Sequence, residues 1–108
     1  AGELKHGPIA LIEKDTVVIA LATQPSVAQK TISNILETVA RGAKVILIAS
    51  QSQNTEGFEY VIRIPDVDPL LSCIPATVLL QELAYYVAKE KGCDVDKPRN
   101  LAKSVTVE

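Results

Sequence analysis

Apolar residues gather into three short runs, and two longer stretches with helical character follow the first and the third. The runs cover residues 16–22, 44–49 and 58–64. The first two are almost entirely apolar and rich in β-branched residues, which is typical of strands covered on both faces in a parallel sheet. The third alternates between two sets of positions and favours a strand nearer the sheet edge.

The residues between the first two runs predict a helix over 27–41. Its apolar positions recur at helical spacing and share one face: Ala28, Ile32, Ile35, Leu36 and Val39. Ser26, with Gln29 three residues later, has the capping-box spacing and predicts the N-cap. Gly42 predicts the stop. Strand, helix, strand is a βαβ unit, whose crossover we expect to be right-handed.

A second helix is predicted over 70–91, with Pro75 kinking or restarting it near its first turns and Gly92 ending it. Residues 50–57 are polar and rich in turn formers, and we expect them to be the least ordered part of the chain. The Asp66/Asp68 pair flanks prolines and indicates turn chemistry.

These elements predict an α/β fold: a three-layer parallel sheet flanked by helices. Three strands leave two exposed sheet edges, and an upstream strand would cover one of them. The chain also opens on Ala1 rather than Met. We therefore expect the domain, residues 1–93, to be incomplete at its N-terminal end. Residues 94–108 are predicted to be a tail that lies back over the domain, because Leu101 and Val105 have little use in a solvated tail.

Composition narrows the classes of function. Hydrophobic residues make up 47% of the chain and the formal net charge is −2, so nothing favours nucleic acid or an anionic membrane as a partner. No apolar run approaches the ~18 residues of a membrane span, and no signal-peptide pattern is visible. Cys73 and Cys93 lack metal-ligand spacing and are expected to be buried or half-buried thiols in a reducing cytoplasm. We expect no metal and no cofactor.

Two residue types suit carbonyl chemistry. Lys103, within a β-prone run, would form an imine if burial lowered the pKa of its amine, but spacing alone favours a lysine that keeps the tail soluble. His6, held by Gly7-Pro8, would give and take protons, although a lone loop histidine is usually just solvated. Glu3 is better explained by its helical turn. Hydroxyls in 50–52 follow a strand and are a weak candidate for a phosphate contact.

Two stretches at the ends of the chain carry a family resemblance. They are AGELKHGP at residues 1–8 and DVDKPRNLAKSVTVE at residues 94–108. Together they resemble the isomerase module of the glucosamine-6-phosphate synthase family, whose members are glutamine–fructose-6-phosphate aminotransferases. The first stretch is shared more loosely with other sugar-isomerase (SIS) domains, whereas PRNLAKSVTVE is more specific.

The resemblance implies a partial SIS domain and a tail that closes a sugar-phosphate site. Lys103 matches the lysine that forms an imine with fructose 6-phosphate. His6 matches a histidine that assists ring opening in the neighbouring subunit's site of a homodimer, and Ala102 matches a tail position whose backbone lines the sugar. The family's phosphate-binding loop and its carboxylate base match no residues here and belong to the upstream part of the same polypeptide.

These implications lead to one main expectation and one alternative. The chain is expected to take part in converting fructose 6-phosphate and glutamine-derived ammonia into glucosamine 6-phosphate, in the cytoplasm, and to be inactive by itself. The alternative is a non-catalytic SIS module for sugar-phosphate binding or dimerisation. An imine-forming lysine would have no purpose in such a module.

Overall fold

The computed structural model describes residues 1–97 and 99. Backbone contacts divide the chain into a compact unit over Ala1–Ala76 and a second unit that begins at Thr77. The elements in chain order are η1 (Leu4–His6), η2 (Pro8–Leu11), β1 (Val17–Ala22), α1 (Pro25–Val39), β2 (Lys44–Ser50), β3 (Tyr60–Ile64), η3 (Pro69–Leu71) and α2 (Cys73–Glu90).

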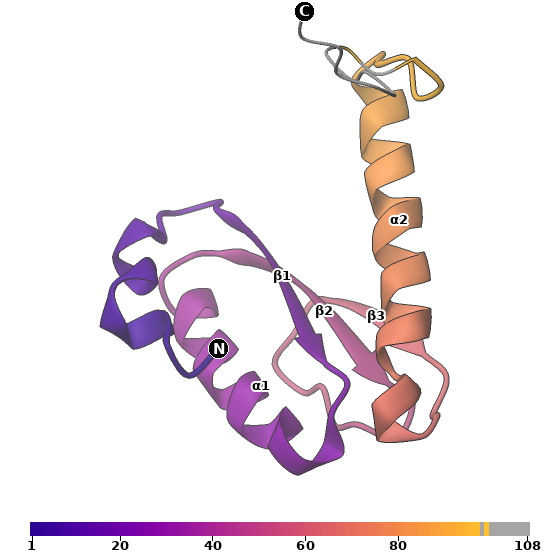
Figure 1. Cartoon of the computed structure of the whole chain (residues 1–108). Coiled ribbons are helices and arrows are strands. Elements are labelled where there is room, and N and C mark those ends of the chain that lie inside the picture. The colour runs from indigo at the N-terminus through magenta and orange to yellow at the C-terminus, as the bar shows by residue number, and fades with distance from the viewer. Residues whose placement is uncertain (98, 100–108) are drawn as a thin grey trace, which may run out of the picture. The chain divides into compact units, whose positions relative to one another are not determined.

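The three strands form one parallel sheet in the order β1-β2-β3 (Figure 1). Ala20 pairs with Leu47 of β2, which in turn pairs with Val61 of β3. Helix α1 lies along one face of this sheet (Figure 1). The predicted α/β fold, with a parallel sheet and helices, is confirmed, and β3 is an edge strand as its alternating pattern indicated.

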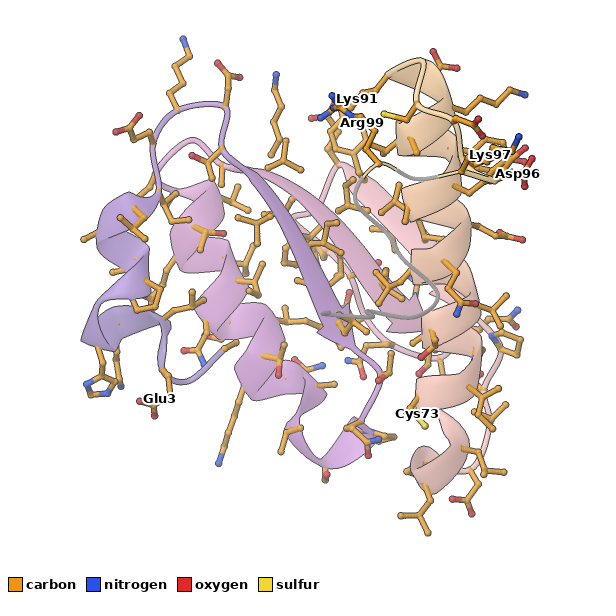
Figure 2. All side chains as sticks on the ribbon, turned by 45° about the horizontal axis from the view of Figure 1, so that its top comes forward. Glu3, Cys73, Lys91, Asp96, Lys97 and Arg99 are labelled. Carbon is orange, nitrogen blue, oxygen red and sulfur yellow. The ribbon has the colours of Figure 1, made fainter. Side chains whose placement is uncertain are left out.

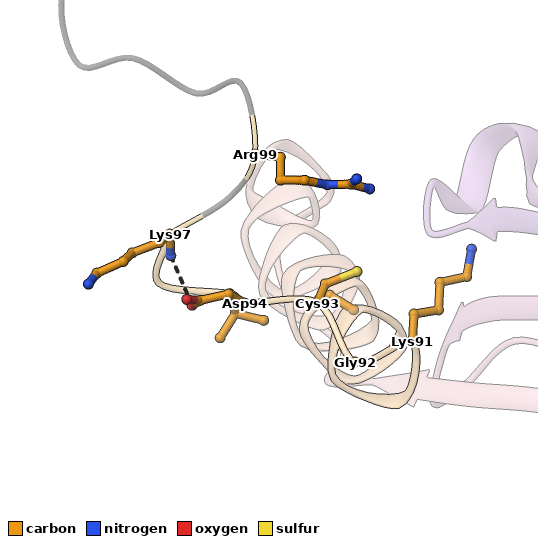
Figure 3. Close-up of a pocket in the computed structure, with 8 residues that line it drawn as sticks. Lys91, Gly92, Cys93, Asp94, Lys97 and Arg99 are labelled. Atoms are coloured by element: carbon orange, nitrogen blue, oxygen red, sulfur yellow. Dashed lines mark hydrogen bonds between the residues drawn. The ribbon is translucent and has the colours of Figure 1, made fainter.

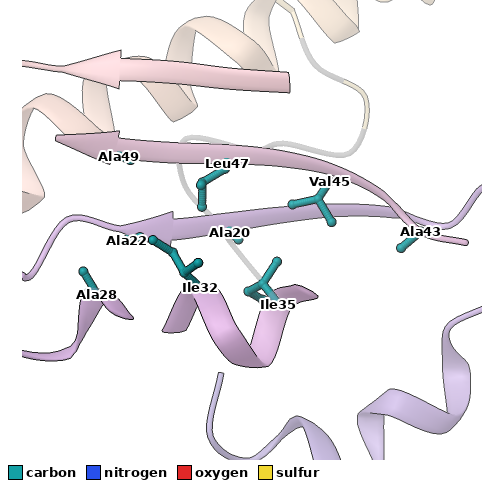
Figure 4. Packing of buried hydrophobic residues seen from close by; sticks show 9 residues of the cluster. All are labelled: Ala20, Ala22, Ala28, Ile32, Ile35, Ala43, Val45, Leu47 and Ala49. Atoms are coloured by element: carbon teal, nitrogen blue, oxygen red, sulfur yellow. The ribbon is translucent and has the colours of Figure 1, made fainter. Parts of the chain in front are cut away.

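The core lies between α1 and the sheet (Figure 4). Leu47 and Ala49 of β2 are fully buried, and Ile32 and Ile35 of α1 pack in the same cluster. Complete burial of a leucine side chain contributes about 1.5–3 kcal/mol. Alanines on β1 and β2 leave room for the helix to approach the strands closely. The α1 face predicted from periodicity is therefore the buried one, with the addition of Thr38, whose Oγ1 donates to the Ile35 carbonyl at 2.7 Å.

The opposite face of β1 is open in the described part of the chain. Val17, Ile19 and Leu21 are 63%, 44% and 41% exposed. The prediction that this strand is covered on both faces is wrong for the described residues. The edge of β1 that faces away from β2 pairs with no other strand of this sheet.

Both ends of α1 depend on residues with fixed or unusual backbone angles. The helix begins at Pro25, with Gln24 as its N-cap, so the predicted Ser26 cap is wrong. Proline suits the first helical position because its φ is already helical and it lacks an N–H group that would go unpaired. At the other end the helix stops at Val39. Gly42 follows with a φ of +90°, a backbone angle suited to the residue that was predicted to end the helix.

The second helical region is interrupted where the sequence indicated. A 3-10 turn, η3, ends before Ser72, and α2 begins at Cys73 with Pro75 in its first turn. Gly92 follows the helix with a φ of +68°. By length and composition, Pro69–Glu90 is apolar enough to cross a membrane, with a mean hydropathy of 1.4, which corrects the expectation that no apolar run approaches that length. Glu82 lies within it, and a carboxylate deep in a bilayer is costly.

Both cysteines are free and exposed, which corrects the prediction of buried thiols. Cys73 is the first residue of α2 and is labelled in Figure 2. Cys93 comes directly after the terminating glycine, where the chain leaves the helix. Each thiol therefore lies at a helix end rather than on a packed helical face.

Candidate functional site

The structure places one of the three predicted site residues. His6 is the last residue of η1, and its side chain is exposed. Lys103 and Ala102 lie outside the described residues. The predicted roles of Lys103 and Ala102 in the sugar site, and of His6 in the neighbouring subunit's site, stay predictions.

The turn that carries His6 is anchored by its neighbours. Leu4 packs against the hydrophobic core, and the His6 amide donates to the Glu3 carbonyl at 3.0 Å. The next turn follows at once, with the Ala10 amide donating to the Gly7 carbonyl at 2.9 Å. A fixed backbone with a solvent-facing imidazole suits a residue that acts on a ligand outside its own core.

A cavity of about 450 Å³ lies between this N-terminal segment, β1 and α1. Its lining is mostly apolar, with the Glu3 carboxylate and the Thr31 hydroxyl as its polar side chains. Among the described residues, no Lys, Arg or His side chain lines it, and the Glu3 carboxylate disfavours a phosphate. It borders β1 at Val18–Leu21, the strand with the open face and edge.

A second, more cationic hollow of about 920 Å³ lies at the end of α2 (Figure 3). Lys91, Lys97 and Arg99 line it together with the carboxylate of Asp94. Asp94 Oδ1 accepts from the amides of Asp96 and Lys97, both at 3.0 Å, which forms a turn at the start of the tail. In Figure 3 the side chains of Lys91 and Arg99 lie on one side and that of Lys97 extends to the other. Of these cations, Lys91 directly follows α2 and complements the negative end of the helix dipole.

The loop between β2 and β3 (residues 51–59) is held by Arg63 and Asp66, through contacts that the sequence did not indicate. Arg63 Nη1 donates to the carbonyls of Ser50 and Gln53, both at 2.7 Å, and Nη2 donates to Thr55 Oγ1 at 2.6 Å. Asp66 Oδ1 accepts from the amide and hydroxyl of Ser52 at 3.3 and 2.9 Å. The expectation that 50–57 is the least ordered segment overlooked these contacts.

The same contacts disfavour a phosphate contact at Ser52. The Ser52 hydroxyl is already bonded to a carboxylate. A carboxylate at that distance would repel a phosphate dianion. Asp66 therefore has a larger role than turn formation, whereas Asp68 has the predicted one, since its Oδ1 accepts from the Leu70 amide at 2.9 Å and caps η3.

A side-chain latch lies at the carboxyl end of β1. Gln24 Nε2 donates to the Pro69 carbonyl at 2.7 Å and to Ser72 Oγ at 2.8 Å. Ser72 is 3% exposed and donates from Oγ to Pro69 as well, at 2.9 Å. The latch ties the β1–α1 turn to η3. Gln24 is a polar residue before a proline. Nothing in the local sequence indicates that its side chain would contact Ser72, 48 residues later.

Two exposed groups near the start of the strands have shifted pKa values. The Asp15 carboxylate, 2.8 Å from Lys44 Nζ, raises the pKa of Lys44 through a hydrogen bond and its charge. The neighbouring Glu59 carboxylate raises the pKa of Tyr60 in the same way. Within residues 1–97 and 99, His, Cys, Asp and Glu form no group of three or more that would hold a metal ion.

Comparisons with known proteins give close relatives. The chain is 60% identical to a glutamine–fructose-6-phosphate aminotransferase (isomerizing) of Clostridium tetani and 57% identical to that of Clostridium acetobutylicum, over 100% and 99% of this chain. In both cases it spans 18% of the relative's length. It also resembles the solved C-terminal domain of glucosamine-fructose-6-phosphate aminotransferase from Francisella tularensis, with a TM-score of 0.79 and 36% identity, covering 89% of this chain and 28% of that one.

A family model for the SIS domain matches residues 1–87, which include His6, the sheet and most of α2. The match and the parallel sheet with its covering helix agree with each other and with the close relatives. This chain therefore belongs to the SIS domain family.

Proposed function

We propose that this chain is the C-terminal part of the isomerase module of a glutamine–fructose-6-phosphate aminotransferase, which makes glucosamine 6-phosphate. The observation that carries the proposal is the extent of the similarity. Identity of 57–60% runs over 99–100% of the chain, so it takes in the tail with Lys103 as well as the SIS domain. A module that shared only the fold would have no reason to keep the tail.

The proposed chemistry begins at the C2 ketone of fructose 6-phosphate. The neutral amine of Lys103 attacks C2, and loss of water gives an imine. Ammonia then displaces the lysine, and a carboxylate moves a proton between C1 and C2 to give the amino sugar. Because an unperturbed lysine has a pKa near ~10.4, only about one in a thousand is neutral at pH 7. The site must therefore lower the pKa of Lys103.

His6 is proposed to act on the ring oxygen. Its imidazole donates a proton to the oxygen as the sugar ring opens and recovers the proton afterwards. Its exposed position on an anchored turn supports a role in a site completed by another subunit. The backbone of Ala102 is proposed to line the sugar beside Lys103.

We further propose that the chain by itself has no synthase activity. It spans 18% of its relatives' length, and neither the carboxylate base nor the phosphate-binding loop of the family matches residues here. The isolated chain, supplied with ammonia and fructose 6-phosphate, is expected to form no glucosamine 6-phosphate. Product formation by this chain alone would refute that expectation.

Borohydride trapping tests the function directly. The full-length protein is incubated with fructose 6-phosphate, reduced, digested and analysed by peptide mass. A reduced sugar adduct is expected on the Lys103 peptide, absent from Lys103→Arg and retained in Lys97→Arg, a nearby tail lysine. Sugar that binds without any adduct would refute the imine role and favour a non-catalytic sugar-phosphate sensor.

A further inference from the structure

The Gln24–Ser72 latch is a closed set of hydrogen bonds between segments far apart in the sequence. Gln24 Nε2 donates to the Pro69 carbonyl at 2.7 Å and to Ser72 Oγ at 2.8 Å, and Ser72 Oγ donates to the same carbonyl at 2.9 Å. Both amide hydrogens of the Gln24 side chain are therefore used. Only its nitrogen suits this place, because a backbone carbonyl accepts a hydrogen bond and cannot donate one.

Both sides of the latch are anchored in the fold. The Gln24 carbonyl accepts from the amides of Val27 and Ala28 in the first turn of α1, at 3.1 and 2.8 Å. The Gln24 side chain makes no cap hydrogen bond to its own helix, which leaves its amide available for Ser72. Ser72 is 3% exposed and directly precedes α2. One glutamine side chain thus joins the start of α1 to the start of α2.

The start of α2 has little other attachment in the described part of the chain. Ala76 is the buried residue of this helix, which the structure describes along its whole length. The latch and Ala76 belong to the unit Ala1–Ala76, and the helix beyond them belongs to the second unit. The direction in which α2 leaves the first unit therefore depends on its first turn. An 18-residue helix is about 27 Å long, so a tilt of about 10° at its start moves its far end by about 5 Å.

We propose that Gln24 is a positioning residue that fixes the start of α2 and thereby directs the tail that carries Lys103. This inference rests on the proposed function. The tail follows α2 in the sequence, and an imine forms only when the Lys103 amine comes within about 3–3.5 Å of the sugar carbon. Gln24 takes no part in the chemistry. Its loss should therefore slow imine formation and spare sugar binding, because the family's phosphate-binding loop belongs to the upstream polypeptide.

The rate of borohydride-trapped adduct formation in the full-length protein, at saturating fructose 6-phosphate, tests the proposal. Gln24→Met and Gln24→Glu both remove the donor at nearly constant size, and each is expected to slow formation of the Lys103 adduct about tenfold. Calorimetry in the Lys103→Arg background, where no imine forms, should give a Kd for the sugar within about twofold of the value without the Gln24 change. Gln29→Glu, the same change at an exposed glutamine of α1, should alter neither quantity.

The outcomes separate positioning from general stability and from the proposed function. A lower melting temperature of the Gln24 variants with an unchanged rate of adduct formation would overturn the proposal and leave the latch a purely structural contact. A loss of sugar affinity as large as the loss of rate would overturn it as well. Wild-type protein that forms no Lys103 adduct would refute the proposed imine chemistry, whereas equal adduct rates in wild type and both variants would refute the role of Gln24 alone.

Discussion

Lys44 and Asp15 show what an exposed ion pair contributes at the level of single residues. Both side chains are 59% exposed, and 2.8 Å separates Nζ from Oδ1. The hydrogen bond to Asp15, followed by its charge, raises the pKa of Lys44. A pair this exposed is screened by water and salt, so its effect is clearer in a titration than in stability.

Asp15→Asn should therefore lower the pKa of Lys44 toward its ordinary value of 10.5. Because the folded-state pKa is raised, the pair's contribution to stability is fully present below the unfolded pKa and is lost as pH rises through the folded one. NMR titration of labelled lysine measures the shift. Asp66→Asn is the control, since Asp66 contacts Ser52 instead. An unchanged Lys44 titration in Asp15→Asn would contradict the assignment.

At the scale of elements, the turn between α1 and β2 depends on one glycine. Gly42 has a φ of +90°, and a Cβ added there would lie 3.2 Å from Lys14 Cα. Its carbonyl also accepts from the Asp15 amide at 2.8 Å. The turn thus combines a left-handed backbone with close packing against a second segment.

Gly42→Ala should lower the free energy of unfolding by about 1–2 kcal/mol for the left-handed backbone alone, and by more because Lys14 must move. Urea unfolding of the full-length protein measures the loss. Gly2→Ala, where an added Cβ has open space and no positive φ, should be neutral. Gly92→Ala, with a φ of +68° and open space, should fall between the two. Equal losses at the three glycines would contradict this account.

Periodicity predicted these elements better than it predicted their ends. The three strands and two helices lie where the apolar pattern placed them, because burial of one face decides where an element forms. Pro25 begins α1 and Gln24 occupies the N-cap position without a side-chain cap, since a proline at the first position outweighed the capping-box spacing of Ser26. The order of the β2–β3 loop depends on Arg63, 13 residues after Ser50, and local composition holds no signal for such a contact.

Sequence patterns predicted the candidate site less well than they predicted the fold. Spacing alone favoured a solvated role for His6 and a solubilising one for Lys103, and only the family resemblance gave them catalytic roles. The structure places His6 on an anchored, exposed turn and leaves the proposed roles to experiment. Arg63, Asp66 and the Gln24–Ser72 latch were missed because side-chain hydrogen bonds between distant segments follow from the fold and not from sequence spacing.

At the scale of the whole molecule, β1 exposes an apolar face and an edge that another chain segment could cover. It lies at the edge of the sheet, its outer face exposes Val17, Ile19 and Leu21, and the cavity of about 450 Å³ borders it. An apolar edge strand with free backbone groups is a template for pairing with another chain. In the proposed full-length protein, the upstream polypeptide would cover it.

The isolated chain is therefore expected to self-associate as its concentration rises, as measured by sedimentation velocity. Ile19→Lys should reduce this association, because an ammonium group on the open face must lose its hydration when two such faces meet. Val27→Lys is the matched control, since Val27 is also about half exposed but lies on α1. If the wild-type chain stayed monomeric at every concentration, or if both lysine variants reduced association equally, the open face of β1 would not be the contact.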